Sequence, residues 1–223
     1  MMKLTGAIFD MDGTLIDSLG FWDLLWDTFS RRYGNFRPDS EASRTVRTLP
    51  MKEAMYYLHD RLGLGPDGET LYRTANRLLE EFYEQQVELK PGVLEFLTQC
   101  RDRGVKMCVA SASDLKLVRV AMAHCGIEEF FPMVFSCSDI GKGKEEPDVF
   151  LAAREHLGTP LEETWVFEDS FVALQSAHRA GFPTVGVYDR YGFRQDILQE
   201  TATIYIAEGE TLMHVFDQSE RKE

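Results

Sequence analysis

Short apolar runs alternate with helix-like patterns along most of this chain. The runs are typical of strands buried on both faces of a sheet, and they occupy residues 4–10, 105–110, 133–136, 164–167, 184–188 and 202–206. Apolar positions with helical spacing lie between them, at residues 93–103, 114–125, 147–158 and 170–180. This alternation predicts an α/β fold, with a Rossmann-like parallel sheet covered by helices on both faces.

Residues 18–88 differ, because they show helical spacing throughout and no strand pattern. Three stripes recur at helical steps, namely Leu19, Trp22, Trp26, Phe29 and Tyr33, then Met51, Met55, Leu58 and Leu62, then Leu71, Leu78 and Phe82. We therefore predict an α/β core domain of residues 1–16 and 90–223, and an inserted α-helical cap domain of residues 17–89. An insertion after the first strand lies above the carboxyl edge of the sheet, where ligands bind, so it is a candidate lid.

Composition narrows the classes of function. The chain has 223 residues and a formal net charge of −13, from 24 Lys and Arg against 37 Asp and Glu. An acidic body repels nucleic acids and anionic membrane surfaces, so we predict neither as a partner. A bound cation or one lysine can reverse the sign of the charge inside a single pocket. The acidic net charge is therefore compatible with a small anionic substrate.

The sequence also bears on the compartment. No apolar run is long enough to span a bilayer, and Asp10 and Asp12 interrupt the apolar start, which argues against a secretory signal. The four cysteines lack Cys-x-x-Cys spacing, as expected for free buried thiols in a reducing compartment; they are Cys100, Cys108, Cys125 and Cys137. We predict a cytoplasmic protein that is a monomer or a homodimer.

Polar residues follow the predicted strands, beginning with Asp10 and Asp12 after the first. Two carboxylates at a strand end can act as nucleophile and acid, or can bind a hard cation, although solvated acid pairs are also common. The second run ends at Ser111, Ala112 and Ser113. Hydroxyl and backbone N–H groups there suit a phosphate oxygen. They can instead cap the next helix, which is the interpretation we favour for Ser113.

A lysine and a second acid pair complete the series. Lys144 precedes the helix predicted at 147, where its charge can reach a phosphoryl oxygen or an aspartate, although Lys142 is close and either can be a surface lysine. Glu168 and Asp169 follow the run 164–167. The carboxyl ends of parallel strands meet at one edge, so these groups can converge. Acids alone would repel one another, which implies a divalent cation, and an oxygen-only ligand set suits Mg²⁺.

Four motifs in this order resemble the haloacid dehalogenase-like hydrolase superfamily. They are DMDGTLIDS, VASAS, KEEPDVF, and EDS followed by the helix ALQSAHRAG. The resemblance covers nearly the whole chain. The helical insertion between the first two motifs looks like the C1-type cap of subfamily IA, and its spacing is similar to that of the beta-phosphoglucomutase and phosphoglycolate phosphatase-like branch.

The resemblance implies a role for each motif. Asp10 is the implied nucleophile, which becomes an aspartyl phosphate, and Asp12 is the implied general acid and then base. Lys144 would neutralise charge between Asp10 and the phosphoryl group. The implied cofactor is Mg²⁺, with ligands from Asp10, Asp12, Asp169 and Glu168. The implied substrate contacts are Ser111, Ala112, Thr14 and Trp22.

Two activities fit this resemblance. Mutase-like relatives carry a histidine and an arginine in the cap, where this chain has Trp22 and Met51, and Thr14 looks more like the phosphatases. We therefore favour a phosphatase of a small phosphorylated metabolite, with a beta-phosphoglucomutase-like sugar-phosphate mutase as the alternative. Trp22 is a candidate substrate contact, although an apolar stripe of this kind more often forms the core of a helical bundle.

Two other classes fit less well. A phospho-signalling receiver also has strand-end acids, a hydroxyl and a lysine, but it is shorter and lacks a helical insertion. A non-catalytic phospho-ligand-binding protein on the same fold would be natural if one key residue were missing, and none is.

Overall fold

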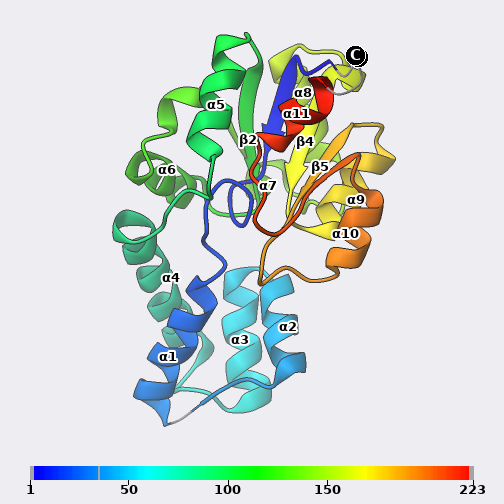
Figure 1. Ribbon diagram of the computed structural model, residues 1–223. Coiled ribbons are helices and arrows are strands. Elements are labelled where there is room, and N and C mark those ends of the chain that lie inside the picture. The colour runs from blue at the N-terminus through cyan, green and yellow to red at the C-terminus, as the bar shows by residue number, and fades with distance from the viewer. Residues whose placement is uncertain (1–2, 35, 221–223) are drawn as a thin grey trace. The chain divides into compact units, whose positions relative to one another are not determined.

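The computed structural model describes residues 3–34 and 36–220 (Figure 1). Its six-stranded sheet has the order β3-β2-β1-β4-β5-β6, and every neighbouring pair is parallel. The strands are β1 Gly6–Phe9, β2 Lys106–Ser111, β3 Val134–Ser136, β4 Thr164–Glu168, β5 Thr184–Val187 and β6 Ile204–Ile206. The predicted α/β fold is therefore confirmed.

Strand β1 lies inside the sheet, between β2 and β4. Gly6 is opposite Lys106 on one side and opposite Thr164 on the other. From β1 the chain goes outward to β2 and β3, and it then returns to build β4, β5 and β6 on the other side. Ligands of open α/β sheets bind at such a reversal, outside the carboxyl ends of the strands. The residues after β1 therefore lie where a ligand is expected.

Helices cover this sheet. They are α5 Val93–Asp102, α6 Leu115–His124, α7 Cys137–Ile140, α8 Asp148–Leu157, α9 Phe171–Arg179, α10 Gln195–Thr201 and α11 His214–Glu220, with 3₁₀ turns at Glu128–Phe130 and Leu161–Glu163. The predicted helices correspond to α5, α6, α8 and α9. The sequence pattern missed α7, α10 and α11, because helices of 4 or 7 residues are too short to show a helical stripe.

Successive residues of β1 point to opposite faces of the sheet. Ile8 packs in a buried cluster with Phe150 of α8 and Ala177 of α9. On the other face the Phe9 ring stacks on Phe167, with centroids 4.4 Å apart, and meets the edge of Phe96 from α5. Because both faces are packed, the position of the carboxyl end of β1 is fixed.

The segment Leu19–Gln86 forms a compact unit of its own, and the chain on either side of it forms the other. Its helices are α1 Phe21–Tyr33, α2 Ser40–Thr48, α3 Met51–Leu62 and α4 Gly68–Gln85. This confirms the predicted helical insertion after the first strand. Most of the predicted stripes form its core, including the buried Trp26, Phe29, Met55 and Leu58. Leu62, the last residue of the second stripe, lies at the end of α3 with 40% of its surface exposed.

The two linkers of the insertion pair with each other beside the sheet. Ile16 and Leu89 form an antiparallel bridge. The Asp17 N–H donates to the Glu88 carbonyl at 2.9 Å, and the Lys90 N–H donates to the Leu15 carbonyl at 2.9 Å. We call residues 15–17 and 88–90 the linker ribbon. It makes the chain leave and re-enter the α/β unit at one place.

Two further properties follow from the described residues. None of the helices in 3–34 and 36–220 combines the length and the apolar character needed to cross a membrane. The four cysteines are free, and three of them are buried, namely Cys100, Cys108 and Cys137. Burial raises the pKa of the Cys108 thiol to about 12, so this cysteine is protonated and inert at neutral pH.

A single methyl group at Gly6 should destabilise the sheet. A Cβ at this position would collide with the hydroxyl of Thr159, whose oxygen lies 2.7 Å from the Thr164 hydroxyl. Gly6→Ala is expected to lower the free energy of unfolding by about 1–3 kcal/mol, measured by urea denaturation. Adding Thr159→Ala should recover part of this loss, because it removes the colliding oxygen. An unchanged urea midpoint for Gly6→Ala would contradict the close packing.

Candidate active site

Asp10 is the first residue after β1 and lies at the reversal of strand order. Its N–H donates to the Phe167 carbonyl of β4 at 2.9 Å, which continues the sheet pairing by one residue. Only 6% of its surface is exposed. The backbone is therefore fixed by the sheet, and the carboxylate stands at the carboxyl edge between β2 and β4.

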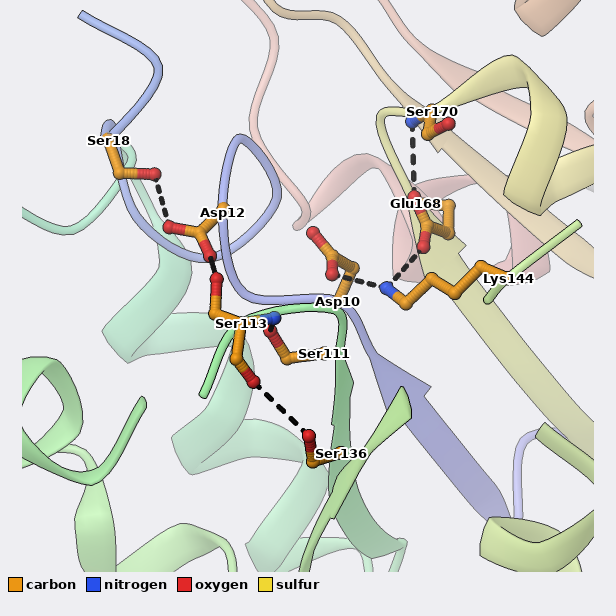
Figure 2. Close-up of polar contacts among 9 residues, drawn as sticks. All are labelled: Asp10, Asp12, Ser18, Ser111, Ser113, Ser136, Lys144, Glu168 and Ser170. Atoms are coloured by element: carbon orange, nitrogen blue, oxygen red, sulfur yellow. Dashed lines mark hydrogen bonds and ion pairs between the residues drawn. The ribbon is translucent and has the colours of Figure 1, made fainter. Parts of the chain in front are cut away.

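Lys144 connects this carboxylate to the end of β4 (Figure 2). Its ammonium contacts Asp10 Oδ1, and it donates to Glu168 Oε1 at 2.6 Å. The other oxygen of Glu168 accepts from the Ser170 N–H at 3.1 Å. Burial alone would lower the pKa of Lys144, but the charges of Asp10 and Glu168 outweigh it and raise this pKa. Lys144 is therefore a permanent cation, held in place by two carboxylates.

Three buried carboxylates gather around that single cation. Asp10, Glu168 and Asp169 each offer an oxygen, and these oxygens lie within 4.8 Å of one another. Burial raises the pKa of Asp10 to about 8, although the charge of Lys144 opposes this shift. Burial, with the charges of Asp10 and Glu168, also raises the pKa of Asp169 well above its ordinary range. Three carboxylates with one ammonium leave an excess of negative charge, and their oxygen-only donor set fits a hard divalent cation.

The carboxylate of Asp12 is held by two serine hydroxyls. Ser18 donates to Asp12 Oδ1 at 2.6 Å, and Ser113 donates to Asp12 Oδ2 at 2.8 Å (Figure 2). The chain reverses between Asp12 and Ser18 because Gly13 adopts a φ of +80°, which a residue without Cβ tolerates. Asp12 is thus oriented from both sides and remains only half-buried.

Neither of these two serines caps a helix, which corrects the interpretation of Ser113 made from the sequence. Ser113 was expected to cap the following helix, but Asp114 caps α6 by accepting from the Lys116 N–H at 2.8 Å. Ser18 does not cap α1, whose N-terminal residue is preceded by Gly20. Sequence reasoning missed both contacts with Asp12. A signal was present for Ser18, because it ends the motif DMDGTLIDS, whose Asp-Gly turn folds the chain back.

The second motif lies beside Asp12. Ser111 is the last residue of β2 and is 1% exposed, and its hydroxyl accepts from the Ser113 N–H at 3.0 Å. Ser136, the last residue of β3, donates to the Ser113 carbonyl at 3.3 Å. Ala112 lies in the turn between Ser111 and Ser113 and is exposed. This turn is therefore braced by hydroxyls from neighbouring strands, and Ser111 stands next to the carboxylates.

The structure distinguishes the two lysines of the third motif. Lys142 is exposed and pairs with Asp148 at 2.7 Å, near the start of α8. Lys144 reaches Asp10 and Glu168 instead. Spacing alone could not separate them, because the choice depends on the path of the loop after α7.

Two predicted substrate contacts lie outside this group. The Thr14 side chain is fully buried behind the turn after β1, and its hydroxyl has no hydrogen-bond partner among the described residues. Trp22 belongs to the helical unit, where it packs on Trp26 with ring centroids 5.5 Å apart. The Arg47 guanidinium lies over the Trp22 ring at 5.7 Å. The assignment of both residues to the substrate remains a prediction.

Comparison with known proteins extends these observations. The family described as haloacid dehalogenase-like hydrolase matches residues 7–187. The phosphorylated carbohydrates phosphatase of Thermotoga maritima is 23% identical over 183 residues, which cover 82% of this chain and 84% of the relative. The fructose-1-phosphate phosphatase YqaB of Escherichia coli is 25% identical over 185 residues, with 83% and 97% covered.

The fold is also shared with a solved structure. The crystal structure of a candidate beta-phosphoglucomutase from Thermotoga maritima superposes with a TM-score of 0.81 at 21% identity, over 96% of this chain and 99% of that one. At this identity the likeness concerns the fold alone. Together with the family match, it confirms the resemblance that the four motifs predicted.

Proposed function

Because this chain belongs to the haloacid dehalogenase-like hydrolase family, we propose that it is a phosphatase that hydrolyses a phosphate monoester through an aspartyl phosphate on Asp10. The observation that carries the proposal is the buried Asp10 carboxylate, held by Lys144 beside two further carboxylates and in the same turn as Asp12. Relatives named as phosphatases support the same reaction. A nucleophile, a fixed cation and an adjacent acid are the groups that phosphoryl transfer needs.

In the first step an Asp10 carboxylate oxygen attacks phosphorus. A bond forms between this oxygen and phosphorus as the bond to the ester oxygen breaks, and Asp12 gives its proton to the departing oxygen. In the second step water attacks the aspartyl phosphate. Asp12 takes the proton of that water, the bond between phosphorus and Asp10 breaks, and inorganic phosphate and the free carboxylate result. The two steps return both aspartates to their starting states.

Other residues hold the phosphoryl group during these steps. Lys144 already touches Asp10, so its ammonium can offset the repulsion between the carboxylate and the phosphate oxygens. We assign the Ser111 hydroxyl and the backbone of Ala112 to the remaining phosphoryl oxygens, because both lie at the carboxyl end of the neighbouring strand β2. Glu168 keeps Lys144 in place through its own ion pair.

We assign Mg²⁺ to the group Asp10, Glu168 and Asp169, with the backbone carbonyl of Asp12 as a further ligand. The buried oxygen donors and their uncompensated charge fit this cation. When bound, it supplies positive charge that lets a carboxylate approach a phosphate dianion. Among the described residues Lys144 pairs with Asp10 and Glu168 and not with Asp169, and the charge of Lys90 lowers the pKa of Asp169 without outweighing burial. The cation would therefore supply further compensating charge there.

We further propose that the substrate is a small phosphorylated metabolite such as a sugar phosphate, in line with the two relatives above. Residues 1–16 and 90–223 would carry the chemistry, and the cap of residues 17–89 would select the substrate. Thr14 and Trp22 are our candidates for contacts with it, and a Trp ring suits the apolar face of a sugar.

Removing the metal should abolish the reaction. Phosphate release is measured from sugar phosphates, phosphoglycolate, nucleotides and p-nitrophenyl phosphate, with Mg²⁺ and with EDTA. We expect release from at least one ester with Mg²⁺ and a loss of about a hundredfold or more with EDTA, because the cation supplies several kcal/mol of charge stabilisation. Restoring Mg²⁺ in excess should restore the rate, which controls for unfolding by the chelator.

The opposite outcome is also informative. If the folded protein with Mg²⁺ releases no phosphate from any ester, the phosphatase proposal is wrong. Conversion of one sugar phosphate isomer into another in the same samples would then identify a mutase.

A further inference from the structure

The side chain of Lys90 ties the linker ribbon to the α/β unit. Its ammonium pairs with Asp189 Oδ2 at 2.8 Å and donates to the Tyr188 carbonyl at 2.8 Å, both just after β5. The side chains of Lys90 and Asp189 are 14% and 2% exposed. The second oxygen of Asp189 accepts from the Tyr191 N–H at 2.8 Å, which fixes the carboxylate. We call Lys90 with Asp189 the linker clamp.

The surroundings of the ribbon show why one buried contact matters there. A pocket of about 250 Å³ lies beside the ribbon and is lined by Thr14, Asp17 and Lys90, together with the residues after β5 and β6. Side chains therefore do not fill the space between the ribbon and those loops. Another ion pair crosses nearby, between Asp17 and Arg190, but it is 3.7 Å long and exposed. Exposed pairs of this kind contribute little, whereas a buried pair is costly to break.

The ribbon leads directly to Asp12. The Lys90 N–H holds the Leu15 carbonyl, and the next residues of that strand lead through Asp17 to Ser18. Ser18 is the residue that donates to Asp12 Oδ1 at 2.6 Å. The path from the clamp to the carboxylate therefore consists of one backbone hydrogen bond, the residues from Leu15 to Ser18, and the hydrogen bond from Ser18 to Asp12, all within the α/β unit.

We propose that the Lys90–Asp189 clamp is a positioning device for Asp12, which fixes the linker ribbon so that Ser18 orients the carboxylate for proton transfer. The proposal rests on the proposed function, because it takes Asp12 as the general acid. Lys90 and Asp189 are positioning residues, since they act through the ribbon and Ser18. When the clamp is lost, the ribbon shifts toward the pocket, and Asp12 loses one of its two hydroxyl partners.

The choice of leaving group separates this role from a general structural one. An alkyl phosphate leaves as a strong base and needs the proton of Asp12, whereas p-nitrophenyl phosphate leaves without it. The ratio kcat/KM covers only the steps up to departure of the leaving group. A misplaced Asp12 therefore lowers kcat/KM for the alkyl ester and leaves the value for p-nitrophenyl phosphate nearly unchanged.

The test compares Lys90→Met with the wild type on glycerol phosphate and p-nitrophenyl phosphate, with Asp12→Ala as the reference for complete loss of the acid. We expect kcat/KM to fall about tenfold for the alkyl ester, which is part of the full effect of losing a general acid. For the aryl ester it should fall less than about twofold. Lys90→Arg should retain most of the wild-type kcat/KM for the alkyl ester, because it keeps a buried cation beside Asp189.

Two more variants control for folding. Lys90→Met leaves Asp189 buried without its cation, so Lys90→Met/Asp189→Asn removes both charges and should keep the fold while showing the same selective loss. Lys106→Met is the matched control, since Lys106 also donates to a backbone carbonyl, that of Leu157 at 2.7 Å, but at the amino end of β2. Lys106→Met should change kcat/KM for neither ester.

The results can overturn the proposal in distinct ways. An equal loss on both esters, with a changed Mg²⁺ requirement, would place the effect of Lys90 at Asp169 instead of Asp12. Unchanged kinetics in the folded double variant would also overturn it. If Asp12→Ala lowers kcat/KM equally for the two esters, the proposed function fails. If Asp12→Ala lowers kcat/KM only for the alkyl ester and Lys90→Met changes neither value, the clamp alone is refuted.

Discussion

Replacing Asp10 with asparagine is expected to abolish phosphate release, with a fall in kcat/KM of about 10⁴-fold or more. An amide cannot attack phosphorus as a carboxylate does, so no covalent intermediate forms. Asparagine has nearly the same shape, and its carbonyl oxygen can still accept from Lys144, so the fold should persist. Phosphate release and covalent labelling by a radioactive phosphate ester measure the two consequences separately.

The control is an aspartate far from the reaction. Asp102 ends α5 with 68% of its side chain exposed, and Asp102→Asn should leave kcat/KM unchanged. The label in the wild type should map to Asp10 by mass spectrometry. A labelled Asp12, or activity of Asp10→Asn above about a tenth of the wild type, would exclude Asp10 as the nucleophile.

Asp169→Asn is expected to inactivate the enzyme and stabilise the metal-free protein. Burial, with the charges of Asp10 and Glu168, raises the pKa of Asp169 well above its ordinary range, so this carboxyl group destabilises the fold at neutral pH. An amide in its place should add about 1 kcal/mol to the free energy of unfolding. In a chain of this size that raises Tm by about 2–4 °C. The same change removes a metal donor, so activity should fall about 10²–10³-fold, and Mg²⁺ should no longer raise Tm.

The pH dependence of the metal-free wild type tests the same kind of destabilisation. The folded pKa of Asp10 is raised from an ordinary value of 3.8 to about 8, so folding takes up a proton between these values. Stability should therefore fall as pH rises from about 4 to about 8. Saturating Mg²⁺ should remove most of this slope, since the cation replaces the proton. A Tm that is lower in Asp169→Asn than in the wild type would contradict the explanation.

Much of the site could be predicted because strand ends are visible in the sequence. The runs before Asp10, Ser111 and Asp169 are apolar and sharply bounded, and parallel strands bring their carboxyl ends to one edge. Lys144 and Lys142 could not be separated, since a loop can direct either toward the edge. The partners of Ser18 and Ser113 were also beyond the sequence, because a serine before a helix bonds equally well to a backbone N–H or to a nearby carboxylate.

Helix α2 shows a limit of another kind. Its sequence is SEASRTVRT, and within residues 40–47 the buried side chains are Ala42 and Val46, one turn apart. Two small apolar residues make no stripe, so the hydrophobic pattern predicted a helical insertion here without marking α2 as a separate helix. Its start is marked instead by Asp39, which caps the helix by accepting from the Ala42 N–H at 2.8 Å.

The paired linkers have a consequence for the formation of the sheet. Pairing β1 with β2 requires the chain to close over the whole insertion, and the entropy lost in closing a loop grows with the length of flexible chain. The insertion has its own core, in which the Phe21 ring near its start lies 5.9 Å from the Phe82 ring near its end. Once folded, it holds its own ends together. The central strand pair then closes at the entropic cost of two short linkers, which makes this distant pairing effectively a local one.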